Sequence, residues 1–293
     1  MTIVNRSADA APGLQRGAQP HDGAHVFDRD TAVQRVAQNT YAAMLTDRWS
    51  TLRGPNGGYG LAISLRALAA EMPFPDPVAT AAFFHAPARS GPGEIRTEIV
   101  RRGRSVATGE ARLIQDEREI MRVVASYSDL EQAVGLTTEL GAPPALVASE
   151  ANVDLDPAGA FPGSTLPERF NYRVVEPHGW RVGAPSGNAT LEFAIGFAEP
   201  RRIDALALSL IVDVCPRAVY ELGQYMPLTL QLTMHVRARA KAGSLRGRVR
   251  TRHVHHGYHE EDLDLWDSAG TLVAQSRQLA MLSNASSSTD AAR

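Results

Sequence analysis

Two polar side chains lie in apolar surroundings, and both are of types that can position a water molecule. Asp213 lies in the apolar run Leu208–Cys215. A carboxylate there is costly unless it is paired or hydrogen-bonded, and a helix C-terminus also disfavours its charge. Gln278 lies on a small, mostly apolar strand face, where its amide needs partners such as a water or a substrate carbonyl. The positions that share this face are Leu272, Ala274, Ser276 and Ala280.

Purely structural interpretations of these positions stay open. Asp213 could face solvent, because a rotation by one residue along the helix would expose it. Gln278 could be a core amide whose neighbours satisfy it. Simple strand alternation places Thr229 with Gln231 and Thr233, opposite a row of leucines. The residues alone therefore predict that Thr229 is an ordinary exposed strand threonine.

A glycine pair forms a second candidate site. Gly57 and Gly58 precede the apolar helical run that begins at Gly60. The first turn of a helix has free N–H groups and a positive dipole end, and glycine lets a ligand approach that backbone closely. We therefore expect Gly57, Gly58 and the adjacent Tyr59 to contact substrate, with an ordinary turn as the alternative.

A histidine-rich segment after residue 252 raises the question of a metal site. His253 and His255 would share one face of a strand, with Asp262 nearby. Gly257, however, indicates a bulge or turn, and a spacing that spans a turn does not define a set of ligands. We predict neither a metal ion nor a cofactor.

The elements that carry these residues occur twice along the chain. Gly60–Glu71 is predicted to be a helix that ends at Pro73. Asp204–Val214 is predicted to be a second helix, with Asp204 as its N-cap and Pro216 as its stop. After each helix the apolar period changes from the helical spacing to the alternation of strands. One helix followed by antiparallel strands, found twice, predicts a duplicated α+β fold.

This duplication sets the expected domain boundaries. The corresponding landmarks are His85 and Gly103 in the first half and His235 and Gly257 in the second. The tails lack the apolar residues that order a chain, and a Pro/Gly-rich linker separates the units. We expect a tail at 1–24, a first unit at 25–138, a linker at 139–167, a second unit at 168–282 and a tail at 283–293.

Composition argues against several functional classes. The net charge is −2 and the pI is near 6.5, so no basic field indicates nucleic-acid binding. Cys215 is the only cysteine, which excludes an internal disulfide and a cysteine-rich zinc site. The N-terminus has no secretory signal pattern, and no stretch has the length of a membrane span. We expect a cytoplasmic protein without nucleic-acid or membrane partners.

Three segments taken in order resemble the type II acyl-CoA thioesterases. They are the stretches at residues 54–60, 103–108 and 266–278. Members of this family are double hot-dog proteins, in which each antiparallel sheet wraps around its own helix. The resemblance extends from about Phe27 to Leu282. It implies a double hot-dog α+β fold and hydrolysis of an acyl thioester.

The resemblance also implies a site and a reaction. In the family an Asp, a Thr and a Gln of the second repeat hold a water, and the matching positions here are Asp213, Thr229 and Gln278. Asp213 would orient and help deprotonate the water, which attacks the thioester carbonyl without a metal or a covalent intermediate. The expected substrate is an acyl-CoA or acyl-carrier-protein thioester. The expected assembly is a homodimer or a larger even-numbered oligomer, since each unit has a sheet edge and a face to cover.

Two other functions fit the same scaffold. One is an enzyme of a related reaction, either an acyl-CoA hydratase or a thioesterase or cyclase of a polyketide pathway. The chain lacks the Asp-to-His signature of hot-dog hydratases. The other is a non-catalytic module that binds acyl thioesters.

Overall fold

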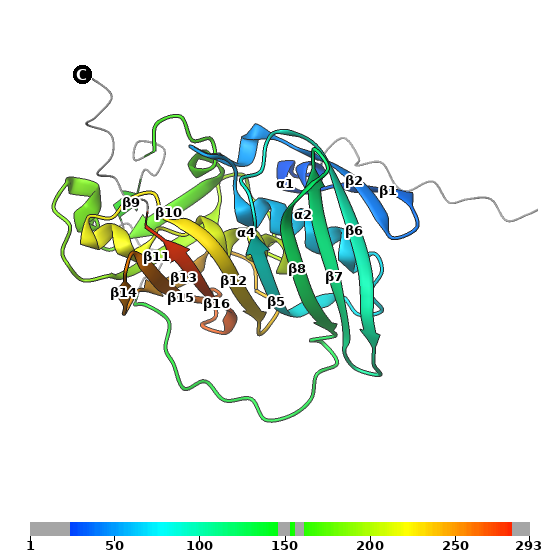
Figure 1. The fold of residues 1–293 in the computed structure, drawn as a ribbon. Coiled ribbons are helices and arrows are strands. Elements are labelled where there is room, and N and C mark those ends of the chain that lie inside the picture. Colours follow the sequence, from blue (N-terminus) through cyan, green and yellow to red (C-terminus); the bar gives the residue numbers. More distant parts are fainter. Residues whose placement is uncertain (1–23, 146–152, 156–160, 283–293) are drawn as a thin grey trace, which may run out of the picture.

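The computed structural model describes residues 24–145, 153–155 and 161–282. Within these residues, one continuous 14-stranded antiparallel sheet forms the body of the molecule. Two long helices, α2 (Gly57–Ala69) and α4 (Ala205–Val214), lie behind this sheet and pack against each other (Figure 1). A separate two-stranded sheet, β3 (Ser50–Thr51) with β4 (Gly54–Pro55), leads into α2.

The first unit places its strands around α2, after a short helix α1 (Val26–Asp30). In sheet order, its strands are β1 (Val33–Ala37), β2 (Thr40–Leu45), β6 (Gly91–Arg102), β7 (Ala107–Gln115), β8 (Arg118–Ser128) and β5 (Asp76–Phe84). The strand that directly follows the helix, β5, is therefore the last in the order.

The second unit repeats this order around α4. Its strands are β10 (Phe170–Val174), β11 (Thr190–Phe197), β13 (Leu245–Arg250), β15 (Tyr258–Trp266), β16 (Leu272–Met281) and β12 (Leu228–Val236). The short β9 (Val153–Leu155) pairs with β10, and β14 (Val254–His255) pairs with β15. Here too the strand that follows the helix, β12, is the last in the order.

These two last strands join the units. β5 and β12 pair in antiparallel fashion, with Ala82 opposite Leu232, and lie side by side at the centre of Figure 1. The two units therefore have the same strand order, read outward from one junction. This topology confirms the predicted double hot-dog α+β fold and the predicted duplication.

The helices lie close to their predicted positions. α4 begins after Asp204, whose side chain accepts a hydrogen bond from the N–H of Ala207 (2.8 Å), as its predicted N-cap role requires. α2 begins at Gly57 instead of Gly60, because Asn56 caps it by accepting from the N–H of Tyr59 (3.2 Å). Apolar periodicity cannot show this start, since the capped turn consists largely of glycine.

The segment between the units contributes to the fold. β9 lies inside the predicted linker at 139–167 and adds a strand to the second unit. Farther along, Ser164 Oγ donates to the carbonyl of Ser50 in the first unit (2.8 Å). The predicted tails fall almost entirely outside the described residues, as do residues 146–152 and 156–160. No helix in the described part is long and apolar enough to cross a membrane.

An aromatic cluster holds the two units together beneath the sheet. Trp49 stacks on Tyr59 (5.9 Å between ring centroids) and meets Phe27 edge-on (5.6 Å). Trp49 also contacts Phe170 and Phe197, which belong to the second unit. Such pairs contribute about 0.5–1.5 kcal/mol each beyond the area they bury. The cluster therefore fixes the start of α2 relative to the second unit.

Candidate active site

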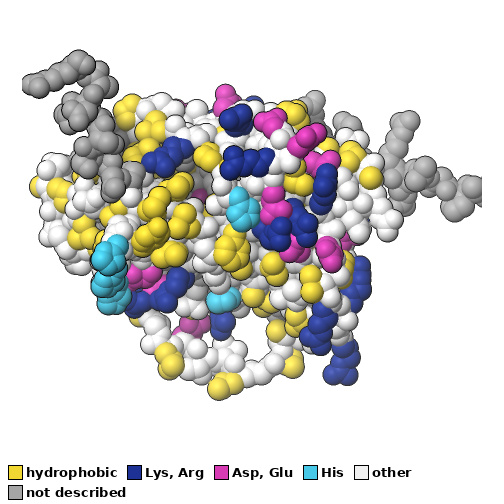
Figure 2. Space-filling view, in the orientation of Figure 1, with side chains coloured by type: hydrophobic (Ala, Val, Ile, Leu, Met, Phe, Trp, Pro, Cys, Tyr) yellow, Lys and Arg dark blue, Asp and Glu magenta, His cyan; other side chains and the backbone are white. Residues whose placement is uncertain are grey.

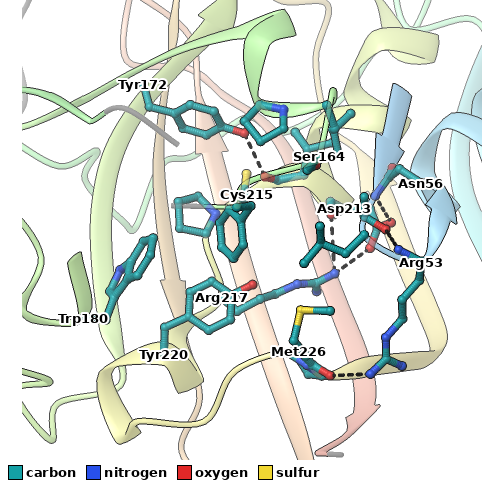
Figure 3. A pocket seen from close by; sticks show the side chains of 18 residues that line it. Arg53, Asn56, Ser164, Tyr172, Trp180, Asp213, Cys215, Arg217, Tyr220 and Met226 are labelled. Carbon is teal, nitrogen blue, oxygen red and sulfur yellow. Dashed lines mark hydrogen bonds and ion pairs between the residues drawn. The ribbon is translucent and has the colours of Figure 1, made fainter. Parts of the chain in front are cut away.

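Asp213 lies in the last turn of α4 and faces the N-terminus of α2. Its Oδ2 accepts from Asn56 Nδ2 and from the Gly58 N–H, both at 2.9 Å (Figure 3). The carboxylate is only 6% exposed. The C-terminus of α4 disfavours its charge, but the positive end of α2 and these two donors compensate. The sequence marked Asp213 as costly, and the structure shows which groups compensate that cost.

Gly58 is required for the two helices to approach each other. A Cβ on Gly58 would lie 2.9 Å from Asp213 Cβ and 2.9 Å from the carbonyl oxygens of Ser209 and Leu210. Backbone carbonyls cannot move aside as a flexible side chain can. A side chain at this position would therefore push α2 away from α4.

The predicted substrate contacts at the start of α2 need correction. The Gly58 N–H, expected to contact substrate, donates to Asp213 instead. Tyr59 is 0% exposed, and its hydroxyl donates to the carbonyl of Asp30 (2.7 Å). Gly57 adjoins Asp213, since a Cβ there would lie 3.1 Å from Oδ2. Gly58 and Tyr59 therefore support the site from within, because internal partners occupy their polar groups.

Arg217 connects the predicted site residues. Its Nη2 donates to Asp213 Oδ1 (2.9 Å) and lies 3.4 Å from Thr229 Oγ1, and its Nη1 donates to Glu261 Oε1 (3.1 Å). Burial alone would lower the pKa of Arg217, but Glu261 and Asp213 raise it above the usual range. The guanidinium is therefore a permanent cation at the centre of the site.

Gln278 and Glu261 lie on the other side of this cation. Gln278 is 3% exposed; its Oε1 accepts from Thr229 Oγ1 (2.8 Å) and its Nε2 donates to Glu261 Oε1 (2.7 Å). Glu261 Oε2 accepts from the Ala218 N–H (2.9 Å). Burial raises the pKa of Glu261 to about 7, although Arg217 opposes this shift. Gln278 thus faces inward as predicted, with both ends of its amide held.

A β-bulge brings Thr229 into this network. Along β12, Leu232 pairs with Gln278, Gln231 with Leu279 and Thr229 with Ala280, so Leu230 has no partner on β16. The extra residue reverses the alternation, and Thr229 joins the face of Leu232 and Gln278. The prediction of an exposed Thr229 from alternation is therefore wrong. Thr229 thus lies within hydrogen-bonding distance of Gln278.

A cavity of about 150 Å³ opens in front of Asp213 and Arg217. Figure 3 shows Arg217 extending from beside Tyr220 toward Asp213, with Trp180 beyond Tyr220. Ring contacts among Phe161, Trp180 and Tyr220 form an aromatic side of the wall. Other lining residues include Thr51, Leu52, Arg53, Ser164, Leu166, Tyr172 and Met226. Thr229 and Gln278 do not line this cavity.

Two of the three predicted residues therefore contact a guanidinium group, and Gln278 is linked to it through Thr229 and Glu261. Asp213 contacts it from the cavity side, and Thr229 contacts it from the strand side. Arg217 and Glu261 were not predicted from the sequence, although each leaves a signal there. Arg217 follows Asp213 by four residues, just beyond the end of α4, so it is a cation close in sequence to a costly carboxylate. Glu261 is a charged residue on the strand face otherwise formed by His259, Leu263 and Leu265.

Two other reactive side chains lie close by but are poorly suited to nucleophilic chemistry. Cys215 is buried, its thiol donates to the carbonyl of Ile211 (3.0 Å), and burial raises its pKa well above the usual value. His259 is buried, and neither ring nitrogen has a hydrogen-bond partner among the described residues. Burial lowers the pKa of His259 and keeps the ring neutral.

The histidine-rich segment lies on the surface. His253 and His255 stack with ring centroids 6.2 Å apart, and Figure 2 shows a histidine patch at the position of β14. In the described part of the chain, no group of three or more His, Cys, Asp or Glu side chains could hold a metal ion.

Comparison with known proteins identifies the family. The model of the acyl-CoA thioesterase N-terminal domain matches residues 45–128, and that of the C-terminal domain matches residues 147–282. A solved structure from Thermobifida fusca, assigned as a thioesterase II, is 30% identical and has a TM-score of 0.81. The alignment covers 88% of this chain and 97% of that one. The chain belongs to the acyl-CoA thioesterase family.

Two further solved structures share the fold. A hot dog fold protein from Alicyclobacillus acidocaldarius is 22% identical, with a TM-score of 0.78 over 89% of this chain and 98% of that one. An acyl-CoA thioesterase II from Mycobacterium marinum is 17% identical, with a TM-score of 0.67 over 88% and 98%. A search of curated protein sequences gives no match. Family membership confirms the predicted activity, the hydrolysis of an acyl thioester.

Proposed function

We propose that this acyl-CoA thioesterase hydrolyses its substrate by direct attack of a water held by Asp213. The observation that carries this proposal is a buried carboxylate on the cavity wall with one acceptor position left. Each carboxylate oxygen can accept about two hydrogen bonds. Asn56 and Gly58 fill Oδ2, whereas Arg217 is the only side-chain donor to Oδ1 in the described residues. A water donating to Oδ1 would therefore be fixed at the cavity.

The proposed reaction needs no covalent enzyme intermediate. The water oxygen bonds to the carbonyl carbon, one water proton passes to Asp213, and the carbonyl π electrons move onto the carbonyl oxygen. The adduct collapses as the C–S bond breaks, and the leaving thiolate takes the proton from Asp213. The products are a carboxylic acid and a free thiol. Because a thioester is already activated, a positioned water and a general base suffice.

Thr229 and Gln278 complete the proposed catalytic set from the strand side. The Thr229 hydroxyl donates to Gln278 and lies beside the Arg217 guanidinium. A carboxylate and an arginine that must keep one geometry gain from such fixed neighbours, because positioning alone supplies a large part of catalysis. Both residues therefore act by holding the groups that meet the water.

We also propose acyl-CoA as the substrate in preference to an acyl-carrier protein, a homodimer as the assembly and the cytoplasm as the location. Phe83 and Leu279, which flank Gln231 on the outer face of the joined sheet, are 47% and 43% exposed and support association of that face. Figure 2 shows hydrophobic side chains among charged ones on the face in view. Light scattering tests the assembly, and a strict monomer at micromolar concentration would contradict it.

The activity is tested by release of free thiol from hexanoyl-CoA and from the same acyl group on a carrier protein. Thiol release from hexanoyl-CoA supports the proposal, and faster release from the carrier protein would reassign the substrate. A hydratase would instead consume an enoyl-CoA without releasing thiol. A binding module would retain acyl-CoA, measurable by calorimetry, with no turnover of any thioester.

A further inference from the structure

We propose that Arg217 is a further catalytic residue, whose guanidinium binds the thioester carbonyl oxygen and stabilises the negative charge that develops on it. This inference rests on the proposed function. Arg217 would stabilise the negative charge on the carbonyl oxygen, whereas Asp213 would accept the proton of the water and return it to the leaving thiolate. No atom is transferred to or from Arg217. Its role is to lower the energy of the tetrahedral adduct.

Arg217 lies where it can contact a substrate in the cavity. Arg217 lines the cavity together with Asp213, whereas Thr229 and Gln278 do not. A substrate in the cavity therefore meets Arg217 before it meets either of those residues. Arg217 Nη2 lies 2.9 Å from Asp213 Oδ1, the atom that would hold the attacking water. The cation and the water would thus sit side by side, as attack on a polarised carbonyl requires.

The guanidinium of Arg217 has more hydrogen-bond donors than its protein partners use. A guanidinium has five N–H donors. The contacts to Asp213, Thr229 and Glu261 use the two on Nη2 and one on Nη1. Among the described residues, the Nε donor and the second Nη1 donor have no partner. These two donors are therefore available to a carbonyl oxygen of the substrate.

The N–H groups of Gly58 and Tyr59 at the start of α2 do not compete with Arg217 for the carbonyl oxygen. The N-terminus of α2 is where the sequence predicted contacts with substrate. The Gly58 N–H there already donates to Asp213, and the Tyr59 N–H donates to Asn56 Oδ1. Both donors are therefore unavailable unless the site rearranges. Two arginines line the cavity, and of these Arg217 contacts Asp213, whereas the exposed Arg53 donates to the carbonyl of Met226.

Glu261 acts as the positioning residue for Arg217. Its Oε1 accepts from both Arg217 Nη1 and Gln278 Nε2, so it fixes two members of the site at once. Because burial raises the pKa of Glu261 to about 7, it is largely protonated below that pH. Asp213 then compensates the charge of Arg217 alone, and the guanidinium keeps more of its field for the substrate.

The test compares kcat and KM for hexanoyl-CoA hydrolysis in the wild type, Arg217→Ala and Arg217→Lys. We expect Arg217→Ala to lower kcat by about 100- to 1,000-fold, as loss of an oxyanion donor does, with little change in KM. Added guanidinium ion should restore part of the lost kcat of Arg217→Ala, a readout that a merely structural role would not produce. Arg217→Lys should retain intermediate activity.

Arg201→Ala is the matched control. Arg201 is as buried as Arg217 (10% against 12% exposed side chain) and also bridges two carboxylates, Asp28 at 2.7 Å and Asp204 at 2.6 Å. It does not line the cavity. Its removal should lower stability and leave kcat near the wild-type value.

A double variant covers the case in which Arg217→Ala does not fold. Arg217→Met with Glu261→Gln removes the Arg217–Glu261 ion pair and keeps the volume, a change that buried ion pairs commonly tolerate. Asp213 loses its cation in this variant but keeps its donors from Asn56 and Gly58. We expect this variant to fold and to lose kcat as Arg217→Ala does. Unchanged or increased kcat in a folded Arg217 variant would overturn the inference, because Arg217 would then only fill space in the cavity. Absence of turnover by the wild type would instead contradict the proposed function.

Discussion

At the scale of single residues, the site is a chain of paired charges that spans both halves of the molecule. Asp213 accepts a hydrogen bond from α2 of the first unit, and Arg217 donates a hydrogen bond to Glu261 on β15. Thr229 closes the chain by contacting both Arg217 and Gln278. Each residue therefore owes its geometry to its neighbours, and their effects on kcat should be non-additive.

Loss of the Thr229 hydroxyl should reduce turnover moderately. We expect Thr229→Val to lower kcat about five- to tenfold, as expected for one hydrogen bond worth about 1 kcal/mol. Thr233→Val, on the same strand but on the opposite face, is the control and should leave kcat unchanged. Steady-state thiol release measures both. Equal effects of the two variants would mean that Thr229 has no special role.

Glu261 should make stability depend on pH. Its pKa is about 7 in the folded protein against 4.5 as the usual value. Between these pH values the folded state holds a proton that the unfolded state releases, so the free energy of unfolding decreases as pH rises through this window. The resulting loss in the free energy of unfolding is on the order of 3 kcal/mol and is fully present above pH 7.

Glu261→Gln removes that proton linkage. Relative to the wild type, the variant should gain stability between pH 4.5 and pH 7, and the difference should level off above pH 7. Urea unfolding at several pH values measures this difference. A difference that stays constant across the window would contradict the raised pKa.

At the scale of elements, the contact between α2 and α4 determines whether the site can form. Gly58→Ala would place a Cβ 2.9 Å from two backbone carbonyls of α4. We expect a loss of about 1–3 kcal/mol, as for overpacking of a core, together with lower kcat, because Asp213 would be displaced. Gly60→Ala is the control, since its Cβ meets only the flexible end of Met121 at 3.0 Å and Leu113 at 3.4 Å.

Urea unfolding of the two glycine variants separates these cases. Gly60→Ala should leave the free energy of unfolding nearly unchanged. Alanine favours a helix interior by roughly 0.5–1 kcal/mol over glycine, and the close contact with Met121 offsets this gain. Gly58→Ala as stable as Gly60→Ala would show that the helices can separate without cost, contrary to the structure.

The sequence predicted these elements better than it predicted the site. Both helices followed from apolar periodicity, and an isolated carboxylate in an apolar run marked Asp213. Thr229 was misplaced because an unpaired Leu230 reverses the alternation, and residue types do not reveal a bulge. The pair of Arg217 and Glu261 was missed because the two residues lie 44 positions apart and meet only when β15 packs next to the segment that follows α4.

At the scale of the whole molecule, the cavity should limit the acyl group. Its volume is about 150 Å³, and cavities of that size hold a ligand such as benzene. We expect hexanoyl-CoA and benzoyl-CoA to be hydrolysed with higher kcat/KM than palmitoyl-CoA. Thiol release over a series of acyl lengths measures this preference. A kcat/KM that rises steadily up to palmitoyl would mean that the acyl chain lies elsewhere.

The same cavity lies where the two units meet, so turnover requires both. Asn56 and Gly58 come from the first unit, whereas Asp213, Arg217 and Glu261 come from the second. The β5–β12 pairing and the aromatic cluster around Trp49 hold the two sets in register. Duplication has thus produced two units of the same topology, and the proposed catalytic residues lie in the second.

The most direct test of the account is kcat for hexanoyl-CoA hydrolysis in Asp213→Asn beside the wild type. Asparagine keeps the size of the side chain but cannot accept a proton from water. We expect the wild type to release thiol and kcat of a folded Asp213→Asn to fall by about 100- to 10,000-fold, the contribution of a general base. A folded Asp213→Asn enzyme with kcat equal to the wild type would contradict the account.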